Sequence, residues 1–263
     1  MYAFDFVRPT TVADAVAALG QEDAQALGGG QTLIPALKQR LASPATLVSL
    51  AGIDEMRRVL VDRLSRFRIG GGTTHAEVAA RTAEYYPALA AMANRIGDPA
   101  VRNRGTIGGS LANNDPSACY PAAVLASDAI VVTNSREIAA DDFFQGMFTT
   151  ALEEGEIITE VRFPIPRAAN YQKFVQPASR FALTAVFVAR FADGVRVAVT
   201  GAAEDGVYRW AEAEAALSDS FTPEAVKALE VPANGMMSDL HGTPDYRAHL
   251  VRVLTARAVA AAA

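Results

Sequence analysis

Two glycine-rich turns constrain the fold of this chain more than any other feature of its sequence. The first turn consists of Leu27, Gly28, Gly29, Gly30, Gln31, Thr32 and Leu33, and the second of Thr106, Ile107, Gly108, Gly109 and Ser110. Glycine lets backbone N–H groups converge on an anion and lets a phosphate approach without meeting a Cβ atom, while the hydroxyl side chains add donors. Together the two turns predict a cradle for a diphosphate.

Other residues near these turns allow two interpretations each. A third glycine run, residues 70–72, either lets two strands or loops pass closely or contacts a cofactor directly. His75 follows it at a predicted helix start, where it makes a local hydrogen bond or lies near the cofactor. Arg102 and Arg104, beside the second turn, are surface charges or contacts for a partner protein.

Composition excludes some classes of function. The 263 residues are 51% hydrophobic, which is enough for a full core in two or three lobes. A formal net charge of −5 argues against a nucleic-acid surface, which needs an excess of clustered Lys and Arg. The sequence shows neither a signal-peptide pattern nor an apolar run long enough for a transmembrane segment, so we expect a cytoplasmic chain.

The single cysteine, Cys119, excludes an internal disulfide and cannot supply the thiolates of an iron–sulfur cluster. We interpret it as a small buried hydrophobe rather than a redox thiol. His241 and His249 lie near no acidic cluster that fits a metal site, so no metal is predicted on this chain. Any metal redox centre must therefore lie on another chain.

Hydrophobic periodicity predicts an alternation of helices and strands before residue 166. Helices are expected over residues 11–19, 33–41, 73–79, 87–96 and from residue 121, and strands over residues 24–27, 46–50, 67–69, 129–133 and 156–163. The first glycine turn thus joins a strand to a helix. We place the main domain boundary at residues 164–166, where two prolines end the last of these strands.

The rest of the chain predicts a smaller domain with an antiparallel sheet. Strands over residues 183–191 and 195–200 flank Asp193 and Gly194, which favour a two-residue hairpin turn with positive φ. Helices are expected over residues 223–229 and 244–260, each with Pro at its first position. The alanine run at the end is expected to fray.

Residues between and after the two turns carry a specific resemblance that covers essentially the whole chain. The matching segments, in family order, are residues 28–35, 96–110, 141–144, 156–160, 171–174 and 241–247. They resemble the FAD-binding medium subunit of molybdenum hydroxylases. Members of that family include the medium subunit of carbon monoxide dehydrogenase and the flavin domain of xanthine dehydrogenase.

The resemblance implies an α+β fold of the vanillyl-alcohol-oxidase type, also called PCMH-type. Residues 1–166 would form the FAD-binding domain, with subdomains of about residues 1–55 and 56–166 that enclose FAD between them. Residues 167–263 would form a C-terminal α+β domain of the carbon monoxide dehydrogenase flavoprotein type.

The resemblance also implies cofactor contacts at positions that match the family. The FAD pyrophosphate would lie between the two turns, with Ile34 added to the first. Ile96 stands where relatives place an aromatic residue over the adenine, and Phe181 where a residue, often Tyr, covers the isoalloxazine ring and would gate access to flavin N5. Further contacts are implied for Asn113, Asn114, Asp115 and Ser117, and for the backbone of Ile158. A contact is also implied for Cys119, at a position where many relatives have Asp. A family lysine falls at Val175, and Lys173 lies close to it in sequence.

The implied function is electron transfer. Electrons would pass from a large molybdopterin-binding subunit through iron–sulfur clusters on a small subunit to the FAD on this chain, and then to NAD, a quinone or dioxygen, in a dimer of heterotrimers. No catalytic side chain is implied on this chain. Two alternatives are a standalone flavoprotein oxidase or dehydrogenase of the same fold and a non-enzymatic regulator that has lost FAD.

Overall fold

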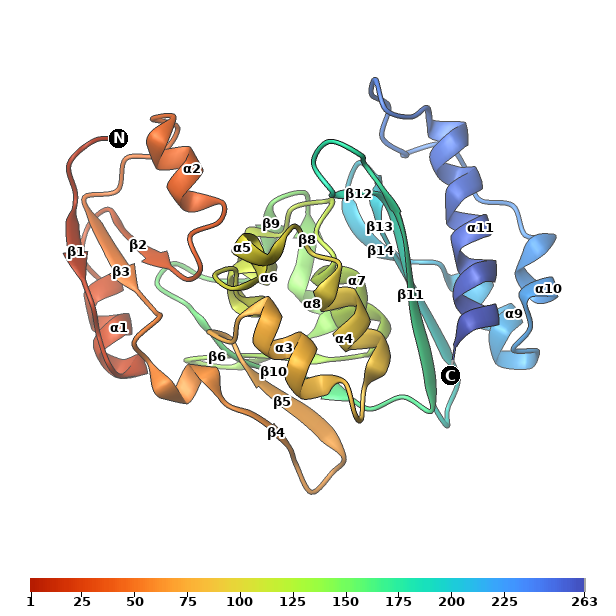
Figure 1. Ribbon diagram of the computed structural model, residues 1–263, viewed down its shortest axis with the longest axis horizontal. Helices are drawn as coiled ribbons and strands as arrows, with labels where there is room; N and C mark the ends of the chain where they lie inside the picture. The colour runs from red at the N-terminus through yellow and green to blue at the C-terminus, as the bar shows by residue number, and fades with distance from the viewer. Residues whose placement is uncertain (263) are drawn as a thin grey trace.

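Three hydrophobic cores follow one another along the long axis of the molecule in the computed structural model, which describes residues 1–262 (Figure 1). The smallest core lies in an N-terminal layer, the largest in the centre and the third in a C-terminal layer. The predicted two or three lobes correspond to these cores.

The N-terminal layer is a three-stranded parallel sheet with one packed helix. Its strands are β1 (Asp5–Val7), β3 (Thr46–Ser49) and β2 (Ala24–Leu27), in that order. Helix α1 (Val12–Leu19) buries Ala15 and Leu19, which share one helix face because they are four residues apart. Helix α2 (Leu33–Lys38) follows the first glycine turn, and the short 3₁₀ helix η1 (Asp54–Arg57) leads to the centre.

The centre contains a five-stranded antiparallel sheet covered by helices. Its strands, in order, are β4 (Val59–Val61), β5 (Arg66–Gly70), β10 (Ile158–Pro164), β6 (Ile130–Thr133) and β7 (Glu137–Ala139). Its helices are α3 (His75–Thr82), α4 (Pro87–Asn94), α5 (Pro99–Arg102), α6 (Ile107–Asn113), α7 (Tyr120–Ala126) and α8 (Ala140–Phe143), and a small hairpin, β8 (Phe144–Gly146) and β9 (Thr149–Thr150), follows them. Thr74 and Glu77 form a reciprocal capping box that starts α3.

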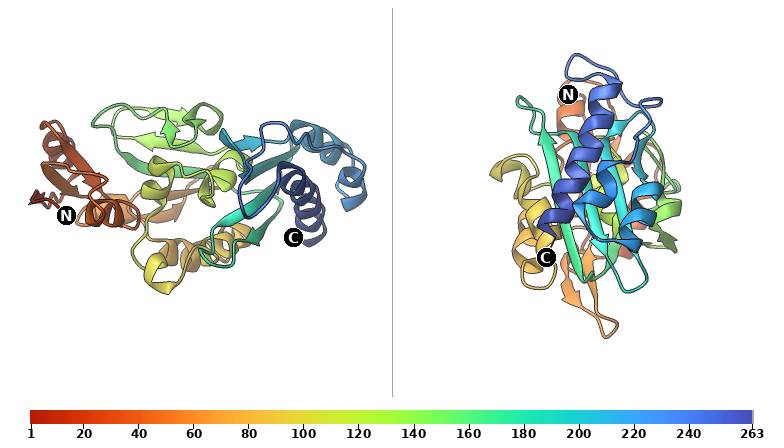
Figure 2. Two further views of the ribbon diagram at one scale, coloured as in Figure 1. Left: turned by 90° about the horizontal axis from the view of Figure 1, so that it is seen from above. Right: turned by 90° about the vertical axis from the view of Figure 1, so that its right-hand side faces the viewer.

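The C-terminal layer is a four-stranded antiparallel sheet backed by helices. It consists of β11 (Ala168–Val175), β12 (Ala182–Arg190), β13 (Val195–Ala203) and β14 (Gly206–Arg209), with α9 (Ala211–Asp219), α10 (Pro223–Lys227) and α11 (Pro244–Ala261). Figure 2 shows α11 lying along the face of this sheet that points away from the centre.

Strand β12 connects the central and C-terminal cores. Its side chains alternate between the two faces of the sheet, so that Ala185 and Phe187 enter the central core while Val186 and Val188 enter the C-terminal one. Helix α7, buried along its whole length, packs between the two sheets. The division at residue 166 stays a prediction, since the central core includes side chains from both sides of it.

Most predicted elements are present with ends shifted by a few residues, and three details differ. Helix α2 ends at Lys38 because Arg40 adopts a left-handed φ of 61°. The β12–β13 hairpin turns at residues 192–193, and only Gly194 has positive φ, so the predicted turn is one residue late. Helix α11 continues through Ala261 instead of fraying, and residue 263 lies outside the described residues. Within residues 1–262, no helix combines the length and the apolar character needed to cross a membrane.

Candidate cofactor-binding site

A cavity of about 700 Å³ opens between the N-terminal layer and the centre, and both glycine turns border it. Its size is typical of small-molecule and cofactor sites. The walls come from segments far apart in sequence: the end of β2 with the first turn, the glycine run before α3, the segment from α5 to α7, the loop before β10, and the β11–β12 loop.

The two glycine turns contact each other through their backbones. A Cβ atom on Gly29 would collide with the carbonyl group of Arg104 and lie 2.5 Å from Cα of Gly105. A Cβ atom on Gly28 would lie 2.9 Å from Oγ1 of Thr106. Any larger residue would push the turns apart, so these glycines are required for the close approach.

The first turn offers unused hydrogen-bond donors. None of the backbone N–H groups of residues 28–33 donates to an acceptor within the described part of the chain. Gly30 adopts a φ of 70°, which a side chain would disfavour. A run of unpaired N–H groups beside a cavity is suited to binding an anion; that a diphosphate binds at this turn stays a prediction.

The second turn contributes differently from the prediction. Most of its N–H groups already have acceptors: Ile107 donates to the Thr73 carbonyl at 3.0 Å, Gly108 to the Gly71 carbonyl at 2.8 Å, and Gly109 to Thr106 Oγ1 at 3.2 Å. What the turn adds is backbone without a side chain at the border of the cavity, since a Cβ on Gly109 would make a tight contact with Thr106 Oγ1 at 3.0 Å. The Ser110 side chain also borders the cavity.

The third glycine run fits both interpretations. A Cβ atom on Gly70 or Gly71 would collide with the carbonyl group of Met56 or Ile158, respectively, so the run does let segments pass closely. Gly71 and Gly72 also border the cavity.

All but three of the predicted contact residues border the cavity. Those that do are Leu27, Gly28, Gly29, Gly30, Gln31, Thr32, Leu33, Ile96, Thr106, Gly108, Gly109, Ser110, Asn113, Asp115, Cys119, Ile158, Lys173 and Phe181, together with Ser117. Residues that sequence reasoning did not assign also border it, among them Gly97, Ser179 and Arg180. Each of these three adjoins a segment or residue that it did assign.

Ile34, Ile107 and Asn114 do not border the cavity. Ile34 packs over Gly30, and Ile107 is fully buried in the central core. Asn114 ends α6 with a left-handed φ of 40°, which turns its side chain away from the cavity. Its Nδ2 donates to the carbonyl groups of Gly146 and Thr149 at 2.8 and 2.9 Å, so its side chain fastens the β8–β9 hairpin.

Lys173, rather than Val175, borders the cavity. Its side chain is only 7% exposed, and Nζ donates to the Arg95 carbonyl at 3.1 Å and contacts Cys119 Sγ at 3.5 Å. The register of β11 shifts between Phe174 and Val175, and Val175 is 38% exposed. Strand alternation alone would have placed the side chains of residues 173 and 175 on the same face.

His75 borders the cavity as a buried neutral ring. Burial, and secondarily the positive charge of Arg102, lower its pKa to about 4. The ring lies 5.3 Å from that of Tyr120, and Nδ1 has no hydrogen-bond partner within residues 1–262. Its backbone N–H donates to the Gly105 carbonyl, which ties α3 to the segment before the second turn.

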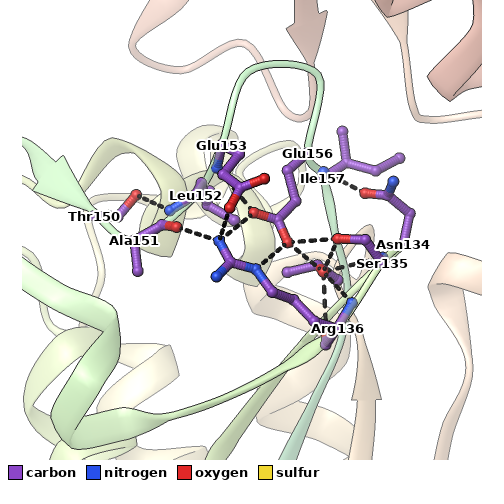
Figure 3. Close-up of polar contacts among 10 residues, drawn as sticks. Asn134, Ser135, Arg136, Thr150, Ala151, Leu152, Glu153, Glu156 and Ile157 are labelled. Atoms are coloured by element: carbon purple, nitrogen blue, oxygen red, sulfur yellow. Dashed lines mark hydrogen bonds and ion pairs between the residues drawn. The ribbon is translucent and has the colours of Figure 1, made fainter.

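Glu156, which sequence reasoning did not select as a site residue, orders one wall of the cavity (Figure 3). Its carboxylate accepts from Arg136 Nε and Nη2 at 3.0 Å each, from Thr133 Oγ1 at 2.6 Å and from the Glu153 N–H at 2.8 Å. The Arg136 hydrogen bond is the main cause that lowers the pKa of Glu156 to about 2, against the effect of burial. This network fixes the loop that delivers Ile157 and Ile158 to the cavity. The only sequence signal was its place in a segment of the family resemblance.

Comparison with known proteins agrees with this geometry. Residues 2–166 match the family described as FAD binding domain in molybdopterin dehydrogenase. The chain is 34% identical to the nicotine 6-hydroxylase medium subunit of Paenarthrobacter nicotinovorans and 33% identical to the carbon monoxide dehydrogenase medium chain of Hydrogenophaga pseudoflava, in each case over 98% of this chain and 96% of the relative.

A solved structure has the same fold over nearly the full length. It is a chain of carbon monoxide dehydrogenase from Hydrogenophaga pseudoflava that lacks the Mo-pyranopterin moiety, with 34% identity and a TM-score of 0.88 over 99% of this chain and 97% of that one. The match confirms the predicted α+β fold of the PCMH type and the resemblance from which it was inferred.

Proposed function

We propose, from the premise that this chain belongs to the family of FAD-binding domains in molybdopterin dehydrogenases, that it transfers electrons through FAD within a molybdenum hydroxylase of three different subunits. The observation that carries this proposal is the run of unpaired N–H groups in the first turn, which borders a cavity of cofactor size together with Gly109 of the second turn.

The residues present fit FAD. The N–H groups of residues 28–33 would bind the pyrophosphate, and Gly109 would admit it without a steric clash. Ile96 and Ile158 supply apolar walls, and Lys173 supplies a buried positive charge. Phe181, 49% exposed at the end of the β11–β12 loop, would cover the flavin from the solvent side. FAD supplies the ability to accept and release electrons singly or in pairs.

Partner subunits must supply the other redox centres. Cys119 is the only cysteine, so iron–sulfur clusters cannot be built on this chain. The relatives are named medium subunit and medium chain, which supports a large molybdopterin-binding partner and a small iron–sulfur partner. We place the complex in the cytoplasm as a dimer of heterotrimers, with NAD, a quinone or dioxygen as the external acceptor.

Flavin binding tests the cradle directly. Gly109→Val should lower FAD affinity at least tenfold, equivalent to about 1.4 kcal/mol, because the new side chain would stand at the border of the cavity and crowd Thr106 Oγ1, 3.0 Å from its Cβ. Titration of the purified chain with FAD, followed by quenching of flavin fluorescence, measures this. Gly20→Ala is the matched control, since a Cβ on Gly20 meets only ordinary contacts far from the cavity.

Equal FAD affinity of the Gly109→Val and Gly20→Ala variants would refute the cradle. Co-expression with candidate large and small subunits tests the complex, because a stable complex should reduce this FAD when substrate is added. Turnover of a reduced substrate by this chain alone would support the standalone enzyme instead. A chain that takes up no FAD would support the regulator.

A further inference from the structure

A buried lysine and a buried thiol meet in the wall of the cavity. Nζ of Lys173 lies 3.5 Å from Sγ of Cys119, and the two side chains are 7% and 5% exposed. Both residues border the cavity, so a small solute that enters it reaches them. They come from β11 and from the residue before α7, far apart in sequence.

The surroundings of this pair contain positive charge and hydroxyl groups. No carboxylate forms an ion pair with Lys173 within residues 1–262, and its one oxygen partner is the Arg95 carbonyl at 3.1 Å. The hydroxyl groups of Tyr120 and Tyr171 are buried without a hydrogen-bond partner in the described chain. Burial, and secondarily the neighbouring Cys119 sulfur, raise the pKa of both tyrosines, which therefore remain hydrogen-bond donors.

Such surroundings offer hydrogen-bond and ion-pair partners to an anion on the sulfur. A thiolate beside an ammonium group is stabilised, and the thiolate is the form of cysteine that reacts with oxidants. An oxidised sulfur that carries an oxygen anion would gain the same ammonium group and two unused hydroxyl donors as partners.

We propose that Cys119 and Lys173 form a redox-sensitive modification site, at which hydrogen peroxide joins the two side chains through a sulfur–nitrogen bond. The site requires only this chain and the peroxide, so the bond can form without a bound cofactor.

Two balanced steps make this bond. In the first, the Cys119 thiolate attacks one oxygen of hydrogen peroxide, the O–O bond breaks, and the sulfur is oxidised by two electrons to a sulfenic acid. The hydroxide that leaves takes a proton from the Lys173 ammonium group and becomes water. In the second, the neutral Lys173 amine attacks this sulfur, the S–N bond forms and the S–O bond breaks, and the oxygen leaves as water with the hydrogen of the sulfenic acid and one hydrogen of the amine.

The modification would change the cavity. It removes the positive charge of Lys173 and draws β11 toward the start of α7, so that the site loses its buried cation. A cofactor bound in the cavity would also shield the pair from peroxide. We expect the cross-linked chain to bind FAD less tightly and FAD-loaded chain to cross-link more slowly.

Mass spectrometry of the full chain tests the site. After treatment with hydrogen peroxide, the wild-type chain should become lighter by two hydrogen atoms, peptides containing Cys119 and Lys173 should appear joined, and dithiothreitol should reverse both changes. Lys173→Arg keeps a cation beside the thiol but has no primary amine. It should therefore stop at a sulfenic acid that dimedone traps, while Lys227→Arg, at an exposed lysine, should behave like wild type.

Two outcomes would overturn the proposal. One is a Cys119 that stays reduced at peroxide concentrations that oxidise free cysteine. The other is oxidation to sulfinic acid at equal rates in the wild-type and Lys173→Arg chains, with no joined peptides. Far-ultraviolet circular dichroism of both chains verifies that they are folded, and because the readout is a mass, it does not depend on whether the chain binds FAD.

Discussion

His75 shows how a single buried residue makes stability depend on pH. Its pKa is about 4 in the folded chain against 6.5 for an ordinary histidine, so between these values the unfolded chain binds a proton that the folded chain does not. The contribution of the neutral His75 ring to the free energy of unfolding is therefore fully present above pH 6.5 and is lost as the pH drops toward 4. The shift corresponds to about 3 kcal/mol at most.

We predict that His75→Gln removes most of this pH dependence. Urea unfolding between pH 7 and pH 4.5 measures how the free energy of unfolding changes with pH, and the slope gives the number of protons taken up on unfolding. This number should be smaller in the variant than in the wild-type chain by about one. His249→Gln is the control because His249 is exposed on α11 and should leave the slope unchanged. An unchanged slope in His75→Gln would contradict a neutral buried ring.

At the scale of an element, the loop before β10 depends on the Glu156 network. The folded pKa of Glu156 is about 2 against an ordinary 4.5, so its stabilising effect is complete above pH 4.5 and is lost as the pH falls through 2. The Glu156 side chain is 3% exposed but that of Arg136 is 40% exposed, so solvent screens part of the attraction between the two charges.

We predict that Glu156→Gln lowers the free energy of unfolding by about 2 kcal/mol at pH 7, because the Arg136 guanidinium and several other donors lose their charged acceptor. FAD affinity should fall too, since the loop positions Ile157 and Ile158. Chemical denaturation and flavin titration measure the two effects. Glu153→Gln is the control: it removes a carboxylate that lies 3.4 Å from the same arginine on a side chain that is 77% exposed, so it should change the free energy of unfolding little. Equal losses of stability in the two variants would contradict a specific role for Glu156.

At the scale of the whole molecule, the central and C-terminal layers depend on each other. The central core takes Ala185, Phe187 and Ala198 from the C-terminal sheet, and helix α7 is buried between the two sheets. A boundary drawn at the prolines separates the chain in sequence but not in packing. The cavity also loses Lys173 and Phe181 if the chain is cut there.

We predict that residues 1–166 alone do not fold cooperatively. The apolar surface of α7 would be exposed, and exposed patches of this kind cause aggregation. Thermal unfolding followed by near-ultraviolet circular dichroism should show a cooperative transition for the full chain and none for the fragment. A sharp transition in the fragment, with FAD bound, would show that the first 166 residues form an independent domain.

The sequence by itself determined the elements and the ligand class. Local periodicity, caps and prolines fixed most helices and strands, because these signals act over a few residues. The glycine turns predicted a diphosphate site, and the segment from Ile96 to Ser110 gave the family. These features depend on residue types at fixed spacing, which a sequence displays directly.

Only the tertiary structure decided which residues border the cavity and which of them have free hydrogen-bond donors. The first turn has free N–H groups while most of those of the second are already bonded, because Thr73 and Gly71 bring carbonyl groups against α6. A register shift in β11 leaves Lys173 rather than Val175 at the cavity, and a left-handed residue turns Asn114 away from it. Contacts such as Lys173 with Cys119, or Arg136 with Glu156, join residues that are distant along the chain, so no local pattern records them.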